Sequence, residues 1–485
     1  MSADRTAASD TNNLPATGVW DGFAYAALVG LVFFIYRASF AAFFINEDFT
    51  WLLRCKLQPG RGLWTLLTSD VILDGAGTSW RPLLQLAFGI EYLVWGVDSV
   101  WYHLISVAWH ALAACALYTL SAQITDRFRA LMTAMVFAAH PIQTESATWV
   151  CAAGGPMSGA LVLFALWASV RWRQRRGRLI FVLGPFALAL GGLESAAVLP
   201  ALILTREVFS DRPALFERRS LRLYGGLAGV FLGFGLLRHL VISAPITLGQ
   251  MGVDPGVPLE ALALTNLLAR KLGNTSSLML NLPADLGWLA LPAAAALTLV
   301  AIWLWWRGAP IALWGLLWIG MGVAPFALRM FGGGPRHLYL AVAGFGLVFA
   351  ELVAQLYRIL QRRSPRFAAL CVSALLGTYL WSGQRAVDRE ETEWVARGAL
   401  HREVVESLLQ VLPDPEPGRP LAFYGLGDLR GRGVFVYGFE DAVRLYYDDP
   451  SMRVEVHRMG EPVESAYRLF YHPDRGFELF DRKRR

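Results

Sequence analysis

Three stretches of this 485-residue sequence place charged or imidazole side chains at the ends of long apolar segments. Glu47 and Asp48 follow the first segment, Arg81 precedes another, and His140 and Glu145 follow a third. An ionisable group at the edge of a membrane is costly, so by default it marks a functional site. A carboxylate can take a proton from a hydroxyl, and an arginine fork suits a phosphate. The stretches therefore predict a partly apolar pocket for an anionic lipid headgroup, lined by acidic side chains.

Further candidates share this chemistry. His103 lies near the outer end of an apolar segment, and Glu194 lies where two short apolar runs meet. A glycine run precedes Arg336, His337 and Tyr339, and its amides could bind an anion. Each residue also has an ordinary explanation, such as an acidic loop edge or an arginine reaching the headgroups. All of these positions fall on one side of the topology that the inner arginines indicate, and this common side favours a shared site.

The composition indicates an α-helical membrane protein. Hydrophobic residues make up 55% of the chain and charged residues 17%, with a mean hydropathy of +0.41. Many apolar runs approach the roughly 20 residues that cross a bilayer. The net charge of +6 is explained by arginines in short loops, as the positive-inside rule expects, rather than by nucleic-acid binding. Residues 1–18 lack the pattern of a signal peptide, so we expect the first apolar run to be retained.

Placing the basic clusters on the cytoplasmic side predicts about eleven spans, with the amino terminus inside and the carboxyl terminus outside. The spans are 22–44, 101–122, 130–141, 156–172, 179–193, 195–208, 223–241, 286–305, 309–328, 338–357 and 367–383. Segment 81–96 is apolar but short, and we expect it to lie at the outer interface. We therefore expect three parts: a cytoplasmic tail (1–21), a transmembrane domain (22–384) with outer loops 45–100 and 242–285, and an extracytoplasmic α/β domain (385–485).

In the last part, residues 385–411 have the pattern of an amphipathic surface helix. The expected strands are 421–424, 433–437, 454–456 and 467–471, with a helix at 439–447. The four cysteines form no metal-binding pattern, and their spacing leaves a Cys55–Cys151 disulfide open.

The motifs resemble those of GT-C glycosyltransferases, especially the transmembrane-and-tetratricopeptide O-mannosyltransferases and their bacterial relatives. That group carries N-D-D-F, Y-R-P-L, G-Y-H-L-x-N…H, H-P-V-H-x-E-A-V-x-W-x-x-G-R-x-D, S-K-E-S and E-R-Y-L-Y-L-P. Over roughly 45–345 this chain has, in the same order, Asn46-Glu47-Asp48-Phe49, Trp80-Arg81-Pro82-Leu83, Tyr102-His103-Leu104 through His110, His140-Pro141-Ile142-Gln143-Thr144-Glu145-Ser146-Ala147-Thr148-Trp149, Leu193-Glu194-Ser195 and Pro335-Arg336-His337-Leu338-Tyr339-Leu340.

This resemblance implies a polytopic GT-C-like fold and a polyprenyl-phosphate sugar as donor. Transfer would take place on the extracytoplasmic face of a bacterial inner membrane. It implies that Glu47 or Asp48 is the catalytic base, and that Arg81 and Arg336 lie near the donor phosphate. The tetratricopeptide array is absent, and residues 385–485 lie outside the resemblance.

The motifs also depart from the family. The G-R-x-D stretch is Ala153-Gly154-Gly155-Pro156-Met157, so its arginine and aspartate are missing, and Leu193 and Pro335 replace a lysine and a glutamate. Two alternatives to a glycosyltransferase therefore stay open: a degenerate relative that binds a lipid-linked sugar or a protein partner, and a lipid-linked sugar transporter. The sugar, the polyprenol, the acceptor (protein, lipid or glycan), the oligomeric state and any dependence on a divalent cation are not determined by the sequence.

Overall fold

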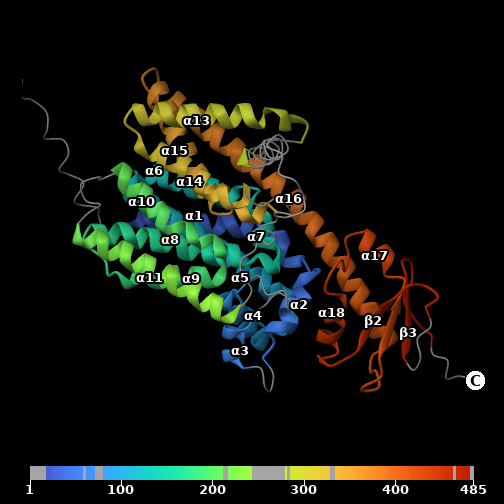
Figure 1. Cartoon of the computed structure of the whole chain (residues 1–485). Helices are drawn as coiled ribbons and strands as arrows, with labels where there is room; N and C mark the ends of the chain where they lie inside the picture. The colour runs from blue at the N-terminus through green and yellow to red at the C-terminus, as the bar shows by residue number, and fades with distance from the viewer. Residues whose placement is uncertain are drawn as a thin grey trace, which may run out of the picture.

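A computed structural model describes residues 18–57, 62–70, 80–210, 217–242, 279–280, 284–327, 334–461 and 466–480. A helical bundle forms most of this structure, and a small sheet follows it (Figure 1). The described helices up to residue 360 are α1 Val19–Ile35, η1 Arg37–Ala41, α2 Glu47–Cys55, α3 Leu63–Thr68, α4 Pro82–Trp95, α5 Ser99–Ile124, α6 Arg127–Ala139, α7 Gln143–Thr148, η2 Val150–Ala152, α8 Gly154–Arg173, α9 Ile180–Gly192, η3 Glu194–Val198, α10 Leu199–Ser210, α11 Arg218–Val241, η5 Ala284–Leu289, α13 Ala290–Trp306, α14 Pro310–Ala327, η6 Pro335–Leu338 and α15 Ala341–Leu360.

Five described helical segments are long and apolar enough to cross a membrane: Ser99–Ile124, Val150–Arg173, Arg218–Val241, Gly287–Trp306 and Ala341–Leu360. The count of about eleven spans is not confirmed. Several other predicted spans coincide with shorter helices. For example, α6 and α9 have 13 residues each, or about 20 Å, against a hydrocarbon core of about 30 Å.

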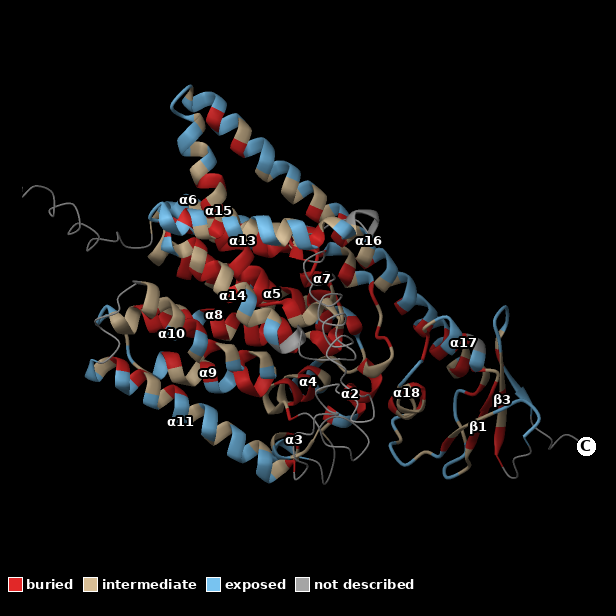
Figure 2. Cartoon of the chain, turned by 45° about the horizontal axis from the view of Figure 1, so that its top comes forward, coloured by how far each residue is buried: buried red, intermediate tan, exposed pale blue. Residues whose placement is uncertain are grey.

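The bundle is packed around α5, α8 and α15, whose inner faces are buried (Figure 2). Small residues let the helices approach closely, as is common in membrane bundles. At the α14–α15 contact, a Cβ on Gly315 would lie 2.8 Å from the carbonyl oxygen of Gly344. Polar side chains cap several helices: Asp98 accepts a bond from the amide of Val100 at the start of α5, and Ser364 caps α16.

The predicted first span, 22–44, is too long. α1 ends at Ile35, and η1 follows it as the chain turns toward α16. There Arg37 pairs with Asp388 at 3.2 Å, and the side chain of Glu391 accepts bonds from Ser39. These polar contacts explain why the helix ends before residue 44.

Helix α16, Pro365–Val411, carries the chain from the bundle to the sheet (Figure 1). It has 47 residues and is therefore about 70 Å long. The predicted span 367–383 and surface helix 385–411 are thus one continuous helix, and the boundary expected at residue 385 lies inside it. The segment near Gly383 contains no helix breaker strong enough to end it, and Gly383 packs closely against the carbonyl of Ala139.

The remaining elements are β1 Leu421–Tyr424, α17 Gly427–Gly431, α18 Phe439–Tyr446, β2 Val454–His457, β3 Tyr467–His472 and β4 Gly476–Phe480. The strand order is β2-β1-β3-β4; β1 is parallel to both neighbours, and β3 and β4 are antiparallel. The predicted strand 433–437 is wrong: Phe435 has a left-handed φ of 48°, and its amide bonds a side chain. Strand β4 was not predicted.

Cys55, Cys115, Cys151 and Cys371 are all free, so the disulfide left open by the sequence is not formed. Most of the predicted outer loop 242–285 lies outside the described residues. Ser79, which precedes Trp80, also lies outside them.

Candidate active site

Asp48 lies in the first turn of α2 and is only 1% exposed. Its two carboxylate oxygens accept hydrogen bonds from the amides of Ile45 and Cys151, each at 2.9 Å. Burial raises the pKa of Asp48 to about 7, although these hydrogen bonds oppose the shift. Asp48 therefore joins the start of α2 to η2, and its oxygens face the protein backbone.

Glu47, the neighbouring residue, is half-buried. Among the described residues, none donates a hydrogen bond to its carboxylate. Burial raises the pKa of Glu47, while the positive charges of Arg336 and Arg81 lower it. Glu47 is thus the more accessible of the two carboxylates, and it lies within the field of two arginines.

The first of these arginines, Arg81, precedes α4 and forms a forked ion pair with Glu194, at the start of η3. Its Nε lies 3.1 and 3.2 Å from the two carboxylate oxygens, and its Nη2 lies 3.0 Å from one of them. Pro82 at the first position of α4 fixes the start of the helix, because proline suits that position. Two residues that are 113 positions apart are thus held together beside α2.

The second arginine, Arg336, lies in η6 and pairs with Glu145 of α7. The Arg336 amide donates to the Glu145 carboxylate at 2.9 Å, and the guanidinium forms an ion pair with the same group. The guanidinium also lies over the ring of Trp149, 4.8 Å from its centre, and Trp149 stacks on Trp394 of α16. A Cβ at Gly334 would collide with the Glu145 carboxylate, so this close contact requires the glycine.

The other predicted site residues have different surroundings. His140 is fully buried: its Nε2 bonds the carbonyl of Met279 at 2.9 Å, and its Nδ1 accepts from the amide of Ile142 at 3.2 Å. The hydroxyl of Tyr339 bonds His110 Nδ1 at 2.7 Å inside the bundle. Both contacts tie segments of the bundle together.

His103 is 2% exposed within α5, and His337 is half-buried next to Arg336. The structure therefore brings together Glu47, Arg81, Glu145, Glu194 and Arg336, and Asp48 is buried next to Glu47.

A histidine outside the predicted motifs also contacts this region. His401 of α16 is fully buried, and its Nδ1–H donates to the carbonyl of Arg397 at 2.8 Å. Its Nε2 therefore accepts from two amides, those of Phe435 at 3.1 Å and Asn46 at 3.3 Å. Burial lowers the pKa of His401 to about 4, which keeps the ring neutral.

Asn46 completes this contact. Its side-chain oxygen accepts from the amide of Val436 at 3.1 Å, and its backbone has a φ of 44°, which is unusual for a residue other than glycine. Asn46 directly precedes Glu47, so the carboxyl-terminal region fixes the backbone at the start of α2.

The stretch that replaces G-R-x-D forms the start of α8. A Cβ on Gly154 would lie 2.8 Å from the carbonyl oxygen of Gly192, at the end of α9. The missing arginine and aspartate are thus replaced by a close contact between helices. Among the described residues, no group of three or more His, Cys, Asp and Glu side chains is arranged to hold a metal ion.

An apolar groove of about 400 Å³ begins next to Arg81 and runs between α4, α9 and α11. Its walls include Trp80, Leu83, Leu188, Gly233 and Phe234. The ring of Trp80 stacks on that of Phe234 with their centres 5.0 Å apart, which closes one side of the groove.

No family model matches the chain. Curated relatives include human Protein O-mannosyl-transferase TMTC3, 28% identical over 167 residues, which are 33% of this chain and 18% of that protein. Drosophila melanogaster Tmtc1 is 30% identical over 128 residues (25% of this chain, 15% of that protein). Xenopus laevis tmtc2 is 33% identical over 115 residues (23% and 13%). The matched stretches thus span less than a fifth of each relative.

Among solved structures, ArnT from Cupriavidus metallidurans has a similar fold. Its apo form gives a TM-score of 0.55 at 10% identity, covering 94% of each chain. Its complex with undecaprenyl phosphate gives 0.53 at 11% identity, covering 95% of this chain and 94% of ArnT. The resemblance to O-mannosyltransferases of the TMTC group and the GT-C-like fold, both predicted from the motifs, are therefore confirmed.

Proposed function

We propose that this chain is a GT-C glycosyltransferase that moves a sugar from a polyprenyl-phosphate donor to an acceptor hydroxyl. The observation that carries this proposal is the position of Glu47, an accessible carboxylate within the field of Arg81 and Arg336. Transfer from a lipid phosphate needs a proton acceptor for the incoming hydroxyl and positive charge for the leaving phosphate. A carboxylate near two arginines can supply both.

The step that we assign to this site is a single displacement. The Glu47 carboxylate takes the proton of the acceptor hydroxyl, and the acceptor oxygen attacks the anomeric carbon of the sugar. The bond from that carbon to the phosphate oxygen breaks, and polyprenyl phosphate leaves with the bonding electron pair. Arg81 and Arg336 stabilise the negative charge that develops on the leaving phosphate.

Asp48 has a different role in this scheme. Both of its oxygens accept backbone amides, so it supports the turn that presents Glu47. Glu145 and Glu194 hold the two guanidinium groups in place before the donor binds, because each forms an ion pair with one of them. A phosphate would replace part of these contacts.

The apolar groove next to Arg81 suits the isoprenoid chain of the donor. Its walls are apolar, and one of them is α11, which is exposed along much of its length. The ArnT complex contains undecaprenyl phosphate, a lipid of the same class. We therefore propose a polyprenyl phosphate as the leaving group.

The relatives named O-mannosyl-transferases suggest mannose as the sugar and a protein as the acceptor. We place the site on the extracytoplasmic face of a bacterial inner membrane, with the amino terminus in the cytoplasm. A degenerate relative remains the second candidate, because the family's arginine and aspartate are missing from the stretch 153–157, where Gly154 makes a close contact between helices.

The test is a donor panel. The full chain in nanodiscs is incubated with several polyprenyl-phosphate sugars and with peptide, lipid and glycan acceptors, and released polyprenyl phosphate is measured. We expect release with one donor and a labelled product with one acceptor class. Binding of a donor without release from any acceptor would support the degenerate relative and contradict the proposed transfer.

A further inference from the structure

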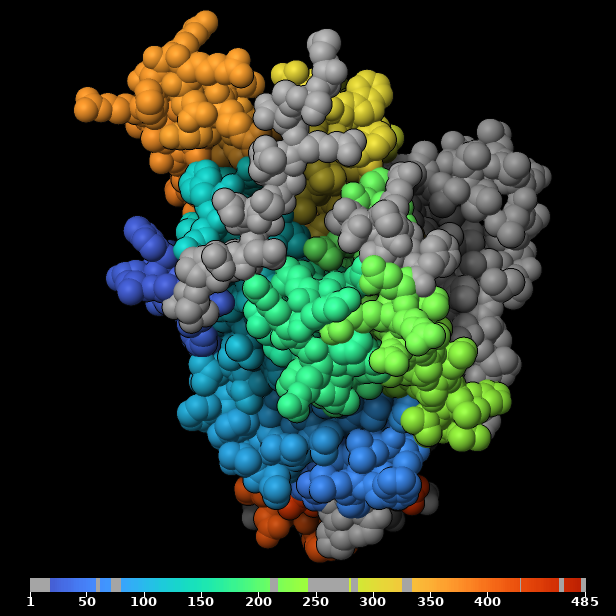
Figure 3. Space-filling view, turned by 90° about the vertical axis from the view of Figure 1, so that its left-hand side faces the viewer, coloured from blue at the N-terminus to red at the C-terminus, as the bar shows by residue number. Residues whose placement is uncertain are grey.

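The end of the bundle opposite the candidate site carries a basic hollow that the proposed transfer does not use. Helix α8 begins at Gly154, beside the site, and runs for 20 residues to Arg173, a distance of about 30 Å. A hollow of about 450 Å³ lies at its far end, at the turn between α8 and α9. Figure 3 views the molecule from this end, where the green segments of α8 and α9 lie beside the yellow-green α11.

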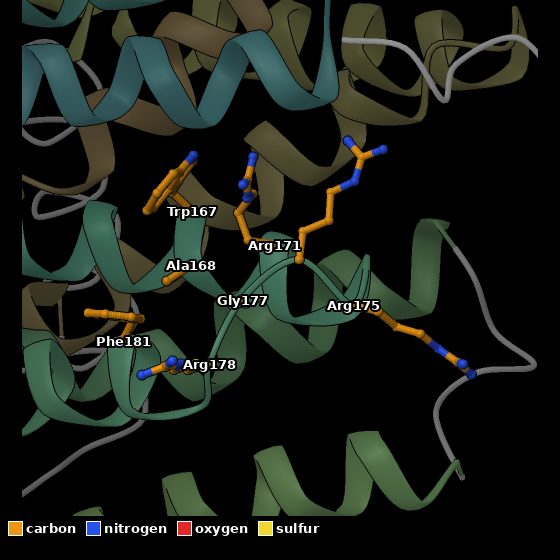
Figure 4. Close-up of a pocket in the computed structure, with 8 residues that line it drawn as sticks. Trp167, Ala168, Arg171, Arg175, Gly177, Arg178 and Phe181 are labelled. Carbon is orange, nitrogen blue, oxygen red and sulfur yellow. The ribbon is translucent and has the colours of Figure 1, made fainter. Parts of the chain in front are cut away.

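The lining of the hollow combines two chemical characters. Four arginines line it, together with the aromatic rings of Trp167 and Phe181 and no carboxylate. In Figure 4, Trp167 and Phe181 lie on one side of the turn and Arg175 extends on the other. The four arginines are Arg171, Arg175, Arg176 and Arg178.

Three of these arginines, Arg171, Arg175 and Arg178, differ in their ion pairs from the neighbouring Arg173. Arg173 pairs with Glu207 at 3.2 Å and with Glu217 at 3.9 Å, and Arg219 lies over the ring of Trp172 at 3.8 Å. Within the described part of the chain, by contrast, no carboxylate pairs with Arg171, Arg175 or Arg178. The guanidinium of Arg171 lies 5.8 Å from the ring centre of Trp167, and both Arg175 and Arg178 are exposed.

The backbone of the turn fixes this cluster. The amide of Arg176 bonds the carbonyl of Arg171 at 2.9 Å, and Arg175 adopts a left-handed φ of 58°. A Cβ at Gly177 would lie 3.2 Å from the amide nitrogen of Trp172, so the turn packs tightly against the end of α8. The arginines that line the hollow are therefore carried by an ordered turn, and their side chains leave it in different directions (Figure 4).

We propose that this hollow binds the phosphate headgroup of an anionic phospholipid, with the lipid's acyl chains against Trp167 and Phe181. Guanidinium groups without carboxylate partners supply the charge that a phosphodiester requires, and basic pockets between membrane helices bind such headgroups. The aromatic rings supply an apolar surface at the depth where a lipid passes from headgroup to chain. Lipid binding in this hollow would be independent of the proposed glycosyl transfer.

Native mass spectrometry of the full chain in detergent tests the proposal. The protein is titrated with phosphatidylglycerol and, separately, with phosphatidylcholine of the same acyl chains. We expect bound phosphatidylglycerol on the unaltered protein and a loss of affinity of about fivefold for each arginine removed in Arg175→Gln/Arg178→Gln. The matched control is Arg362→Gln/Arg363→Gln, which removes the same charge from the exposed turn after α15. Like α8, helix α15 begins near the candidate site and ends away from it.

Three results would overturn the proposal. They are equal losses in the two double variants, equal binding of phosphatidylcholine, and displacement of the lipid by inorganic phosphate at the same concentration. The last result would assign the hollow to a free anion. A second measurement does not depend on the arginine variants and can be used if they fail to fold. Brominated phosphatidylglycerol should quench less tryptophan fluorescence in Trp167→Phe than in the unaltered protein. Equal quenching in the two proteins would contradict a lipid bound next to Trp167.

Discussion

The imidazole of His401 and the backbone of Asn46 are in contact although 355 positions separate them, with Nε2 of His401 3.3 Å from the amide nitrogen of Asn46. His401 belongs to α16, and Asn46 directly precedes Glu47. The same nitrogen accepts the amide of Phe435 at 3.1 Å. A single neutral histidine thus joins the carboxyl-terminal region to the start of the candidate catalytic helix.

We therefore expect His401→Phe to lower kcat by roughly 10- to 100-fold, because two buried amides lose their acceptor. The KM for the donor should change little, since Arg81 and Arg336 are untouched. His401→Gln retains an acceptor oxygen and should recover part of the loss. Leu400→Ala, an exposed position on the same helix, is the control. Steady-state kinetics checks this, and an unchanged kcat in folded His401→Phe would remove the histidine from any positioning role.

Arg81 and Arg336 should bind the donor phosphate. Arg81→Gln or Arg336→Gln should each lower kcat/KM by roughly 10- to 100-fold, the size expected for losing a hydrogen bond to a charged group. Arg81→Lys should recover little, because lysine cannot form the guanidinium fork. Arg307→Gln removes an exposed charge elsewhere. An equal decrease in kcat/KM in Arg307→Gln would mean that the total positive charge of the protein, and not the candidate site, controls donor binding.

The groove beside Arg81 should hold the isoprenoid chain. Gly233 lines the groove and has no atom within 4 Å of a Cβ built on it, so Gly233→Leu adds bulk to open space. We expect a higher KM for a long-chain donor and no change for a short-chain analogue. Gly235, on the same helix, is equally open but does not line the groove, so Gly235→Leu is the matched control. The same KM increase for both donor lengths would argue against this placement of the chain.

Asp48 should make stability depend on pH. Its pKa is 3.8 in an unfolded chain and about 7 in the folded protein, so between these values the folded state binds more protons. This group therefore lowers the free energy of unfolding as pH rises through the window. The Tm of Asp48→Asn, which resembles the protonated form, should rise relative to that of the unaltered protein as pH increases from about 4 to about 7, and the difference should then stay constant. Thermal unfolding in detergent measures this, and a pH-independent difference would show that Asp48 ionises normally.

The sequence predicted most helices because apolar runs of helical length identify them directly. For example, segments 101–122 and 156–172 fall within α5 and α8. Prediction from the sequence failed where contacts between distant segments determine the local structure. Segment 433–437 has the composition of a strand, but its amides at Phe435 and Val436 bond His401 and Asn46 instead.

At the candidate site, too, the sequence predicted the residues but not their long-range partners. The motifs predicted Glu47, Arg81 and Arg336 as residue types, but not their ion pairs, because Arg336 and Glu145 are 191 positions apart. His401 gave only a weak signal, as one member of the apolar stripe that it forms with Val404, Val405 and Leu408 on α16. A polar residue at such a position is explained only when its partner on another segment is known.

The most direct test of the central claim is single-turnover release of polyprenyl phosphate by Glu47→Gln, beside the unaltered protein and Asp48→Asn. The glutamine variant removes the proton acceptor and keeps the size of the side chain. We expect a loss of roughly 10²- to 10⁴-fold in the rate of release by Glu47→Gln, with donor binding retained. Release by folded Glu47→Gln at the unaltered rate would contradict it.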